Sequence, residues 1–258
     1  MIKILHRFFY AWLFLTKLPA LPLPKATKED WGRISPYFVL IGYILGFILY
    51  LFAKLFIYFK LPIMFSALLV LLVWNLITGS LHLDGLMDTF DGINCQDVTR
   101  KVDAMKDSRI GAFGAIGGIF VLLFKLITLC TILLNKMFFV IVLALPLARF
   151  VAIYAFNFLS KNQKSGVSSS LLLNGFKKPK DFLINLLVFV IVFFICKFYF
   201  HLKIVYVFYI LISVFFSLIW AHWLDNHFKG HTGDTFGALI ELSEVTVLSL
   251  AVILKNCF

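Results

Sequence analysis

Seven apolar runs of bilayer length constrain what this chain of 258 residues can fold into. They lie at 36–59, 63–80, 110–134, 137–159, 182–200, 203–223 and 240–256. A helix needs about 20 apolar residues to cross a bilayer, and each run is near that length. Hydrophobic residues make up 62% of the chain and charged residues only 14%. A soluble domain of this size does not need so many apolar residues. We therefore predict one all-α domain, residues 1–258, folded as a polytopic integral membrane helical bundle.

The charge distribution predicts how this bundle sits in the lipid bilayer. Residues 2–17 are apolar but short and contain basic residues, which favours an N-terminal interfacial helix within segment 1–35. With a cytoplasmic N-terminus, sixteen Lys and Arg residues fall on the cytoplasmic side and five on the other. Those sixteen lie in segment 1–35 and in the loops 81–109, 160–181 and 224–239. The net charge of +11 then indicates an anionic membrane surface as partner, with no nucleic acid.

Three aspartates follow the second apolar run at Asp84, Asp88 and Asp91. At about 100° per residue, Asp88 and Asp91 lie about 40° and 20° to either side of Asp84 on a helix. Anions on one narrow face repel one another, and a divalent cation with oxygen ligands would neutralise them. The alternative is a helix cap with solvated acidic residues. The neighbouring His82 is a candidate base or ligand, or a hydrogen-bonding neighbour.

A second acidic segment begins the last apolar run. Asp234 and Glu241 are seven residues apart and share one helical face, with Glu244 a turn beyond. Two acidic helix starts on one membrane face predict a shared metal cluster. The alternative is an N-capped helix, with Thr232 or Asp234 as the cap. That alternative explains Asp234 better than it explains two glutamates in an apolar run.

Basic residues lie both at the start of the third run and inside two runs. Lys106 and Arg109 can hold phosphate oxygens, and Gly111 permits close packing or the approach of a ligand. Taken alone, this block is better explained as a positive-inside anchor with small-residue helix packing. Lys125 and Arg149 lie in the middle of predicted spans, where an unpaired charge costs at least about 2.5 kcal/mol. Lys125 can snorkel, whereas Arg149 is expected to meet a carboxylate or a substrate phosphate.

Taken together, these features predict metal-dependent phosphoryl transfer at the membrane boundary. Several blocks also resemble one known family along nearly the whole chain. The matching blocks are Phe14–Pro19, Gly42, Gly46, Thr78–Gly92, Met105–Gly114, Lys125, Arg149 and Thr232–Glu244. They resemble the cobalamin synthase family of adenosylcobinamide-GDP ribazoletransferases. The chain differs from the family pattern at Lys17, His231 and the loop 163–166.

The resemblance implies a reaction and a cofactor. Adenosylcobinamide-GDP and α-ribazole, or α-ribazole 5′-phosphate, would be joined into adenosylcobalamin or its 5′-phosphate, with release of GMP and with Mg²⁺ as cofactor. The enzyme would lie in a bacterial or archaeal cell membrane, with its N-terminus and active-site loops in the cytoplasm. A homo-oligomer, or a complex with other cobalamin-assembly enzymes, stays open.

The patterns and the resemblance together give a candidate site. The catalytic candidates are His82, Asp84, Asp88 and Asp91. The metal candidates are Asp84, Asp88, Asp91, Asp234 and Glu241. The substrate-binding candidates are Lys106, Asp107, Ser108, Arg109, Gly111, Lys125, Arg149, Thr232 and Gly233.

Two other functions remain as alternatives. A CDP-alcohol phosphotransferase also uses aspartate trios, but the full pattern of that family, in which Asp-Gly, Ala-Arg, Gly and Asp-x-x-x-Asp follow one another at set spacing, is absent here. A transporter would carry charges near the midplane in two related halves, whereas these acids gather on one face.

Overall fold

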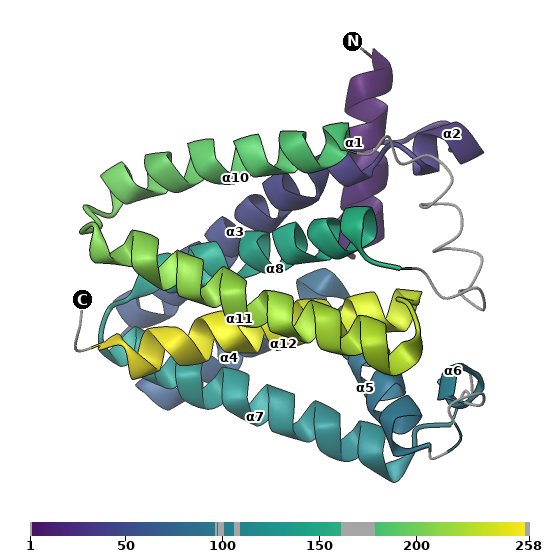
Figure 1. Cartoon of the computed structure of the whole chain (residues 1–258). Helices are drawn as coiled ribbons and strands as arrows, with labels where there is room; N and C mark the ends of the chain where they lie inside the picture. The colour runs from purple at the N-terminus through teal and green to yellow at the C-terminus, as the bar shows by residue number, and fades with distance from the viewer. Residues whose placement is uncertain (1, 96, 98–100, 106–108, 161–178, 256–258) are drawn as a thin grey trace.

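The computed structural model describes residues 2–95, 97, 101–105, 109–160 and 179–255, and within them the secondary structure is entirely helical (Figure 1). The short elements are α2 (Lys28–Trp31), η1 (Ser35–Tyr37) and α6 (Lys101–Ala104). The longer helices are α1 (Ile2–Leu15), α3 (Phe38–Tyr58), α4 (Ile63–Thr78), α5 (Leu81–Asn94), α7 (Ala112–Leu134), α8 (Phe138–Phe158), α10 (Lys180–Tyr199), α11 (Val205–Phe228) and α12 (Gly233–Ile253).

Six helical segments in the described part of the chain are long and apolar enough to cross a membrane, and they contain α3, α7, α8, α10, α11 and α12. The pair α4 and α5 would add a seventh crossing, but the two helices meet at 89°. This arrangement confirms the predicted polytopic helical membrane bundle. We treat α4 as part of the bundle and α5 as a helix outside the membrane-spanning segments.

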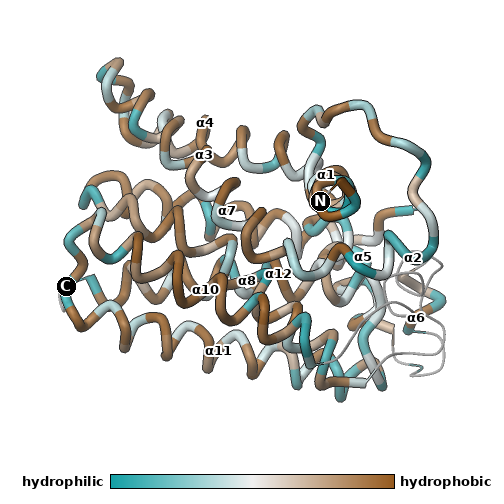
Figure 2. The backbone as a smooth tube through the Cα atoms, turned by 90° about the horizontal axis from the view of Figure 1, so that it is seen from above, coloured by the Kyte–Doolittle hydropathy of each residue, from teal (hydrophilic) through white to brown (hydrophobic). Residues whose placement is uncertain are grey.

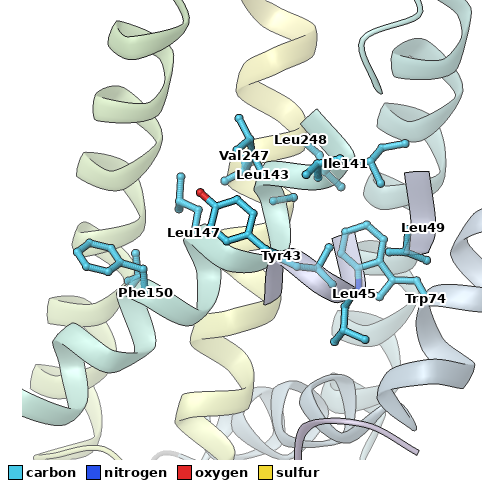
Figure 3. Close-up of a cluster of buried hydrophobic side chains, with 14 of the residues drawn as sticks. Tyr43, Leu45, Leu49, Trp74, Ile141, Leu143, Leu147, Phe150, Val247 and Leu248 are labelled. Carbon is cyan, nitrogen blue, oxygen red and sulfur yellow. The ribbon is translucent and has the colours of Figure 1, made fainter. Parts of the chain in front are cut away.

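Helix α8 forms the centre of the bundle, and nearly all of its side chains are buried in protein. Helix α3 crosses it closely because Gly42 and Gly46 have no side chains at the contact. A Cβ atom at Gly46 would lie 2.6 Å from the carbonyl oxygen of Val142. Around this contact the core gathers large apolar side chains such as Leu49, Trp74 and Leu248 (Figure 3).

Helices α10 and α11 lie at the periphery, and most of their large apolar side chains remain exposed. Such surfaces are expected where a helix faces lipid instead of water. Figure 2 shows the long helices hydrophobic along their length, with more polar residues around α2, α5 and α6. The end of the bundle that holds these three elements is therefore its polar end.

Several boundaries differ from the sequence prediction, and the predicted span 203–223 continues as a helix to Phe228. The predicted span 63–80 is a helix of 16 residues that stops at Thr78, because the chain turns sharply after it. The predicted span 240–256 begins seven residues earlier, at Gly233. Thr232 starts that helix, since its side chain accepts a hydrogen bond from the Thr235 amide in a capping box.

We expect Gly46→Ala to lower the free energy of unfolding by about 1–3 kcal/mol, because the added methyl group meets backbone that cannot move aside. Gly118→Ala is the matched control. Its Cβ would meet only the flexible side chain of Met87, and alanine favours the helix by up to about 1 kcal/mol. Thermal unfolding in detergent measures both variants, and equal melting temperatures would contradict the expectation.

Candidate active site

A sharp corner between α4 and α5 creates the site. Gly79 and Ser80 both adopt left-handed backbone conformations, with φ of 62° and 54°. Glycine suits the first position because of this backbone conformation, and the Lys17 side chain packs against it, with Cγ 2.4 Å from where a Cβ atom would lie. The corner directs α5 across the end of the bundle where α7 and α12 begin and α8 ends (Figure 1).

Two glycines let α5 lie directly against the start of α12. A Cβ atom at Gly85 would lie 2.9 Å from the carbonyl oxygen of Asp234. A Cβ atom at Gly237 would lie 3.0 Å from the carbonyl oxygen of His82. The two backbones therefore touch, and this contact brings the acidic segments of α5 and α12 together.

Four carboxylates lie close enough at this contact to influence one another electrostatically. Burial, followed by the charges of Asp84, Asp234 and Asp91, raises the pKa of the half-buried Asp88 to about 7. The raised pKa means that the ionised form of Asp88 is unfavourable beside the other three carboxylates. The same repulsion favours any cation that enters the cluster.

Asp91 differs from the other aspartates because both of its oxygens already accept backbone hydrogen bonds. The amides of Gly111 and Gly114 donate to the two oxygens at 2.8 Å each. Asp91 therefore caps the start of α7, where a negative charge is favourable. The sequence prediction treated the three aspartates as equivalent and missed this contact. A metal-binding role for Asp91 stays a prediction.

The donor chemistry of the cluster fits magnesium. Within the described ranges, no three Asp, Glu, His or Cys side chains are placed to hold a metal ion between them. Asp84, Asp88 and Asp234 nevertheless offer only carboxylate oxygens. Mg²⁺ commonly binds to proteins through one or two carboxylates, with water and substrate phosphate as its other ligands. These three residues therefore suit an ion that arrives with a phosphorylated substrate.

A cavity of about 280 Å³ lies beside the acidic cluster. Its walls come from α1, α3, α5, α8 and α12, and its polar lining includes His82, Asp84 and Asp234. His82 is only 5% exposed. Burial, and then the charges of Arg149 and Lys125, lower the pKa of His82 well below its usual value, so that its imidazole is neutral at pH 7.

A second polar group, the buried ion network, lies inside the bundle. Lys125 Nζ of α7 lies 2.7 Å from Glu241 Oε2 and 2.5 Å from Glu244 Oε2. Glu244 also accepts a hydrogen bond from Arg149 Nη1 of α8. The Trp74 ring lies 4.6 Å from Lys125 Nζ. Two cations and two anions thus neutralise one another, as charges in an apolar bundle must.

The network changes how three predicted site residues are placed. Glu241, predicted as a metal ligand, contacts Lys125, and a metal-binding role for it stays a prediction. Lys125 and Arg149, predicted to bind substrate, contact the two glutamates. Arg149 Nε and Nη2 have no hydrogen-bond partner among the described residues, although the side chain is fully buried. Substrate binding by these cations stays a prediction.

The other predicted residues fall into two groups. Lys106, Asp107 and Ser108 lie outside the described residues. Arg109 is exposed just before α7, whereas Gly111 is held by Asp91. Thr232 is a buried N-cap, and Gly233 lines the cavity.

Sequence reasoning missed three residues that the structure places at important positions. Glu244 was noticed but not included among the site residues, yet it contacts both buried cations. Phe156 and Phe236 line the cavity, where their rings stack with centroids 3.7 Å apart. Phe236 falls within the matching block Thr232–Glu244, whereas nothing in the sequence distinguishes Phe156 among 31 phenylalanines.

We expect Glu244→Leu to cost about 3–5 kcal/mol of stability, because it leaves the Arg149 guanidinium buried without a counter-charge. The double variant Glu244→Leu with Arg149→Leu removes one charge of each sign and should recover most of that loss. Ser243→Ala is the control on the same helix, since the Ser243 hydroxyl has no partner in the described structure. The melting temperatures of these variants in detergent test the expectation. A double variant no more stable than Glu244→Leu would refute the pairing.

Comparisons with known proteins identify the family of the chain. Residues 7–252 match a family model described as cobalamin-5-phosphate synthase. A protein of Trichormus variabilis named adenosylcobinamide-GDP ribazoletransferase is 34% identical, covering 91% of this chain and 93% of its own length. Proteins with the same name from Thermoanaerobacter pseudethanolicus and Clostridium botulinum are 30% and 32% identical, each covering 95% of this chain.

No solved structure matches the chain. The family model covers almost the whole sequence and includes both acidic segments. The chain therefore belongs to the cobalamin-5-phosphate synthase family.

Proposed function

We propose that this protein is an Mg²⁺-dependent adenosylcobinamide-GDP ribazoletransferase of the cell membrane. A ribose hydroxyl of α-ribazole, or of its 5′-phosphate, attacks the phosphorus on the cobinamide side of the diphosphate. The new oxygen–phosphorus bond forms while the bond to the bridging oxygen breaks, and GMP leaves with the bridging oxygen, which balances the proton lost by the hydroxyl. The product is adenosylcobalamin or its 5′-phosphate.

The observation that carries the proposal is the meeting of Asp84, Asp88 and Asp234 beside a cavity at the polar end of the bundle. Transfer of a phosphoryl group needs positioning and charge neutralisation more than covalent help from the protein. A cluster of carboxylates beside a cavity supports both needs, because it recruits cations and adjoins space for a substrate.

Each residue in the cluster receives a role from its contacts. Asp84, Asp88 and Asp234 would hold Mg²⁺, which when bound supplies positive charge to the diphosphate oxygens. The neutral imidazole of His82 lines the cavity next to Asp84 and accepts a hydrogen bond from the attacking hydroxyl, which orients it. Asp91 acts differently, since it fixes the start of α7 beside the cluster.

We further propose that the acidic cluster faces the cytoplasm of a bacterial or archaeal cell. The support is the excess of Lys and Arg on the side that holds α5 and the N-terminal segment. Nucleotide-activated substrates are also made in the cytoplasm, so this orientation gives them direct access.

The direct test of the activity is an assay of the purified full chain in detergent or liposomes. Adenosylcobinamide-GDP, α-ribazole and MgCl₂ are supplied, and GMP and the corrinoid product are measured together by chromatography. Equal amounts of GMP and cobalamin, abolished by a chelator and restored by Mg²⁺, are expected. GMP released without formation of cobalamin would mean hydrolysis and would refute the proposal.

We expect Asp88→Asn to reduce turnover on the order of 100-fold, because it removes a metal-binding charge while keeping the side-chain size. Its thermal stability should not fall, since the substitution relieves repulsion from Asp84 and Asp234. Asp103→Asn changes an exposed carboxylate on α6 and is the control. Near-normal turnover of Asp88→Asn at limiting Mg²⁺ would show that this carboxylate is structural.

The orientation is tested by labelling single cysteines in a cysteine-free chain. Asn94→Cys at the end of α5 and Lys136→Cys between α7 and α8 are both exposed and lie at opposite ends of the bundle (Figure 1). A membrane-impermeant thiol reagent applied to intact cells should label Lys136→Cys and spare Asn94→Cys. The reverse pattern would place the acidic cluster on the outer face.

A further inference from the structure

The cavity beside the acidic cluster has aromatic walls. Phe14 of α1 and Phe38 of α3 form one stacked pair, with centroids 5.9 Å apart and planes 18° apart. Phe156 of α8 and Phe236 of α12 form a second stacked pair at 3.7 Å and 12°. All four rings line the cavity. The apolar surfaces that these stacked pairs turn to the cavity suit an aromatic ligand.

One wall of the cavity is held rigidly from behind. The His231 ring stacks on Phe236 with centroids 4.8 Å apart. His231 Nε2 lies 3.1 Å from the carbonyl oxygen of Ala221, and His231 Nδ1 lies 3.2 Å from Thr235 Oγ1. Phe236 is thus fixed between Phe156 and a hydrogen-bonded imidazole, so the wall is formed before any ligand arrives.

The cavity is polar at one end and apolar at the other. Along α12 its lining runs from Asp234 to Ile240, six residues and therefore about 9 Å further along the helix. Ala152 of α8 contacts Ile240 within a small apolar cluster. A ligand that fits this gradient carries an apolar ring at one end and a polar group near the carboxylates at the other.

The size and polarity of the cavity indicate which part of the two substrates it can bind. At about 280 Å³ the cavity is just below the range of roughly 300–1,000 Å³ typical of ligand pockets, so it cannot enclose a corrin ring. A guanine base would need several hydrogen-bonding partners, but every side chain that lines the cavity away from His82, Asp84 and Asp234 is apolar. An apolar bicyclic base fits better.

We propose that this cavity binds the heteroaromatic base of the acceptor nucleoside, with its ribose directed toward Asp84 and Asp234. The inference rests on the proposed function and extends it by naming which substrate occupies the cavity. In this arrangement the base lies against Phe156 and Phe38, and the sugar hydroxyls lie at the carboxylate end. The diphosphate substrate then approaches from the acidic cluster.

Phe156→Ala tests the assignment, with Phe150→Ala as the matched control. Both phenylalanines lie on α8 and are at least 92% buried, and both rings stack on a neighbouring ring, but only Phe156 lines the cavity. Phe156→Ala should raise the KM for α-ribazole about tenfold or more while the KM for adenosylcobinamide-GDP changes less than about twofold. Phe150→Ala should leave both values near those of the wild type.

A variant that fills the cavity gives a second test, in which no packing contact of the bundle is removed. Ala152→Leu should weaken binding of α-ribazole, measured by equilibrium dialysis without the second substrate. The same variant should weaken binding of benzimidazole riboside less. The base of that compound lacks the substituents of the α-ribazole base and therefore needs less space. Thermal unfolding of every variant shows that the bundle remains folded.

The outcomes separate this inference from the proposed function. If wild type turns over both substrates but Phe156→Ala and Phe150→Ala behave alike, the cavity does not bind the base. If Phe156→Ala raises the KM for adenosylcobinamide-GDP instead, the cavity holds the guanine, and the assignment is overturned. If wild type neither binds α-ribazole nor forms cobalamin, the proposed function itself fails.

Discussion

The ionic contacts of Glu244 are the constraint on which the rest of the structure depends. One carboxylate of α12 holds a lysine of α7 and an arginine of α8, all of them buried in an apolar bundle. Charges in such surroundings are tolerated only when they are paired. The contacts of Glu244 therefore tie the three helices to one another. Helix α5 packs on α7 and α12, so the network also determines where the acidic face lies.

The membrane-spanning architecture could be predicted from sequence, because the length and polarity of apolar runs report directly on the bilayer. The runs that became α7, α8 and α10 lie within a few residues of their predicted bounds. The corner after α4 could not be predicted in this way. Ser80 adopts a left-handed conformation that its residue type does not indicate, directly after the left-handed Gly79 that Lys17 packs against.

The candidate site was predictable to the extent that it depends on charge. The spacing of Asp84 and Asp88 placed them on one face, and Asp234 joins them. The function of each individual carboxylate depends on its neighbours, which are distant in sequence. Asp91 became a helix cap because α7 begins beside it. Arg149 was expected to meet either a carboxylate or a phosphate, and tertiary packing supplied the carboxylate.

The buried ion network has a consequence for how the chain is made. Lys125 and Arg149 are synthesised 119 and 95 residues before Glu244, so both cations enter the membrane ahead of this anion. At about 5–20 residues per second, the ribosome needs roughly 5–25 s to supply it. Trp74 precedes them all, and its ring lies against Lys125 in the finished bundle. An aromatic face is thus available to shelter this ammonium group during insertion, until α12 completes the bundle and locks α7 and α8 together.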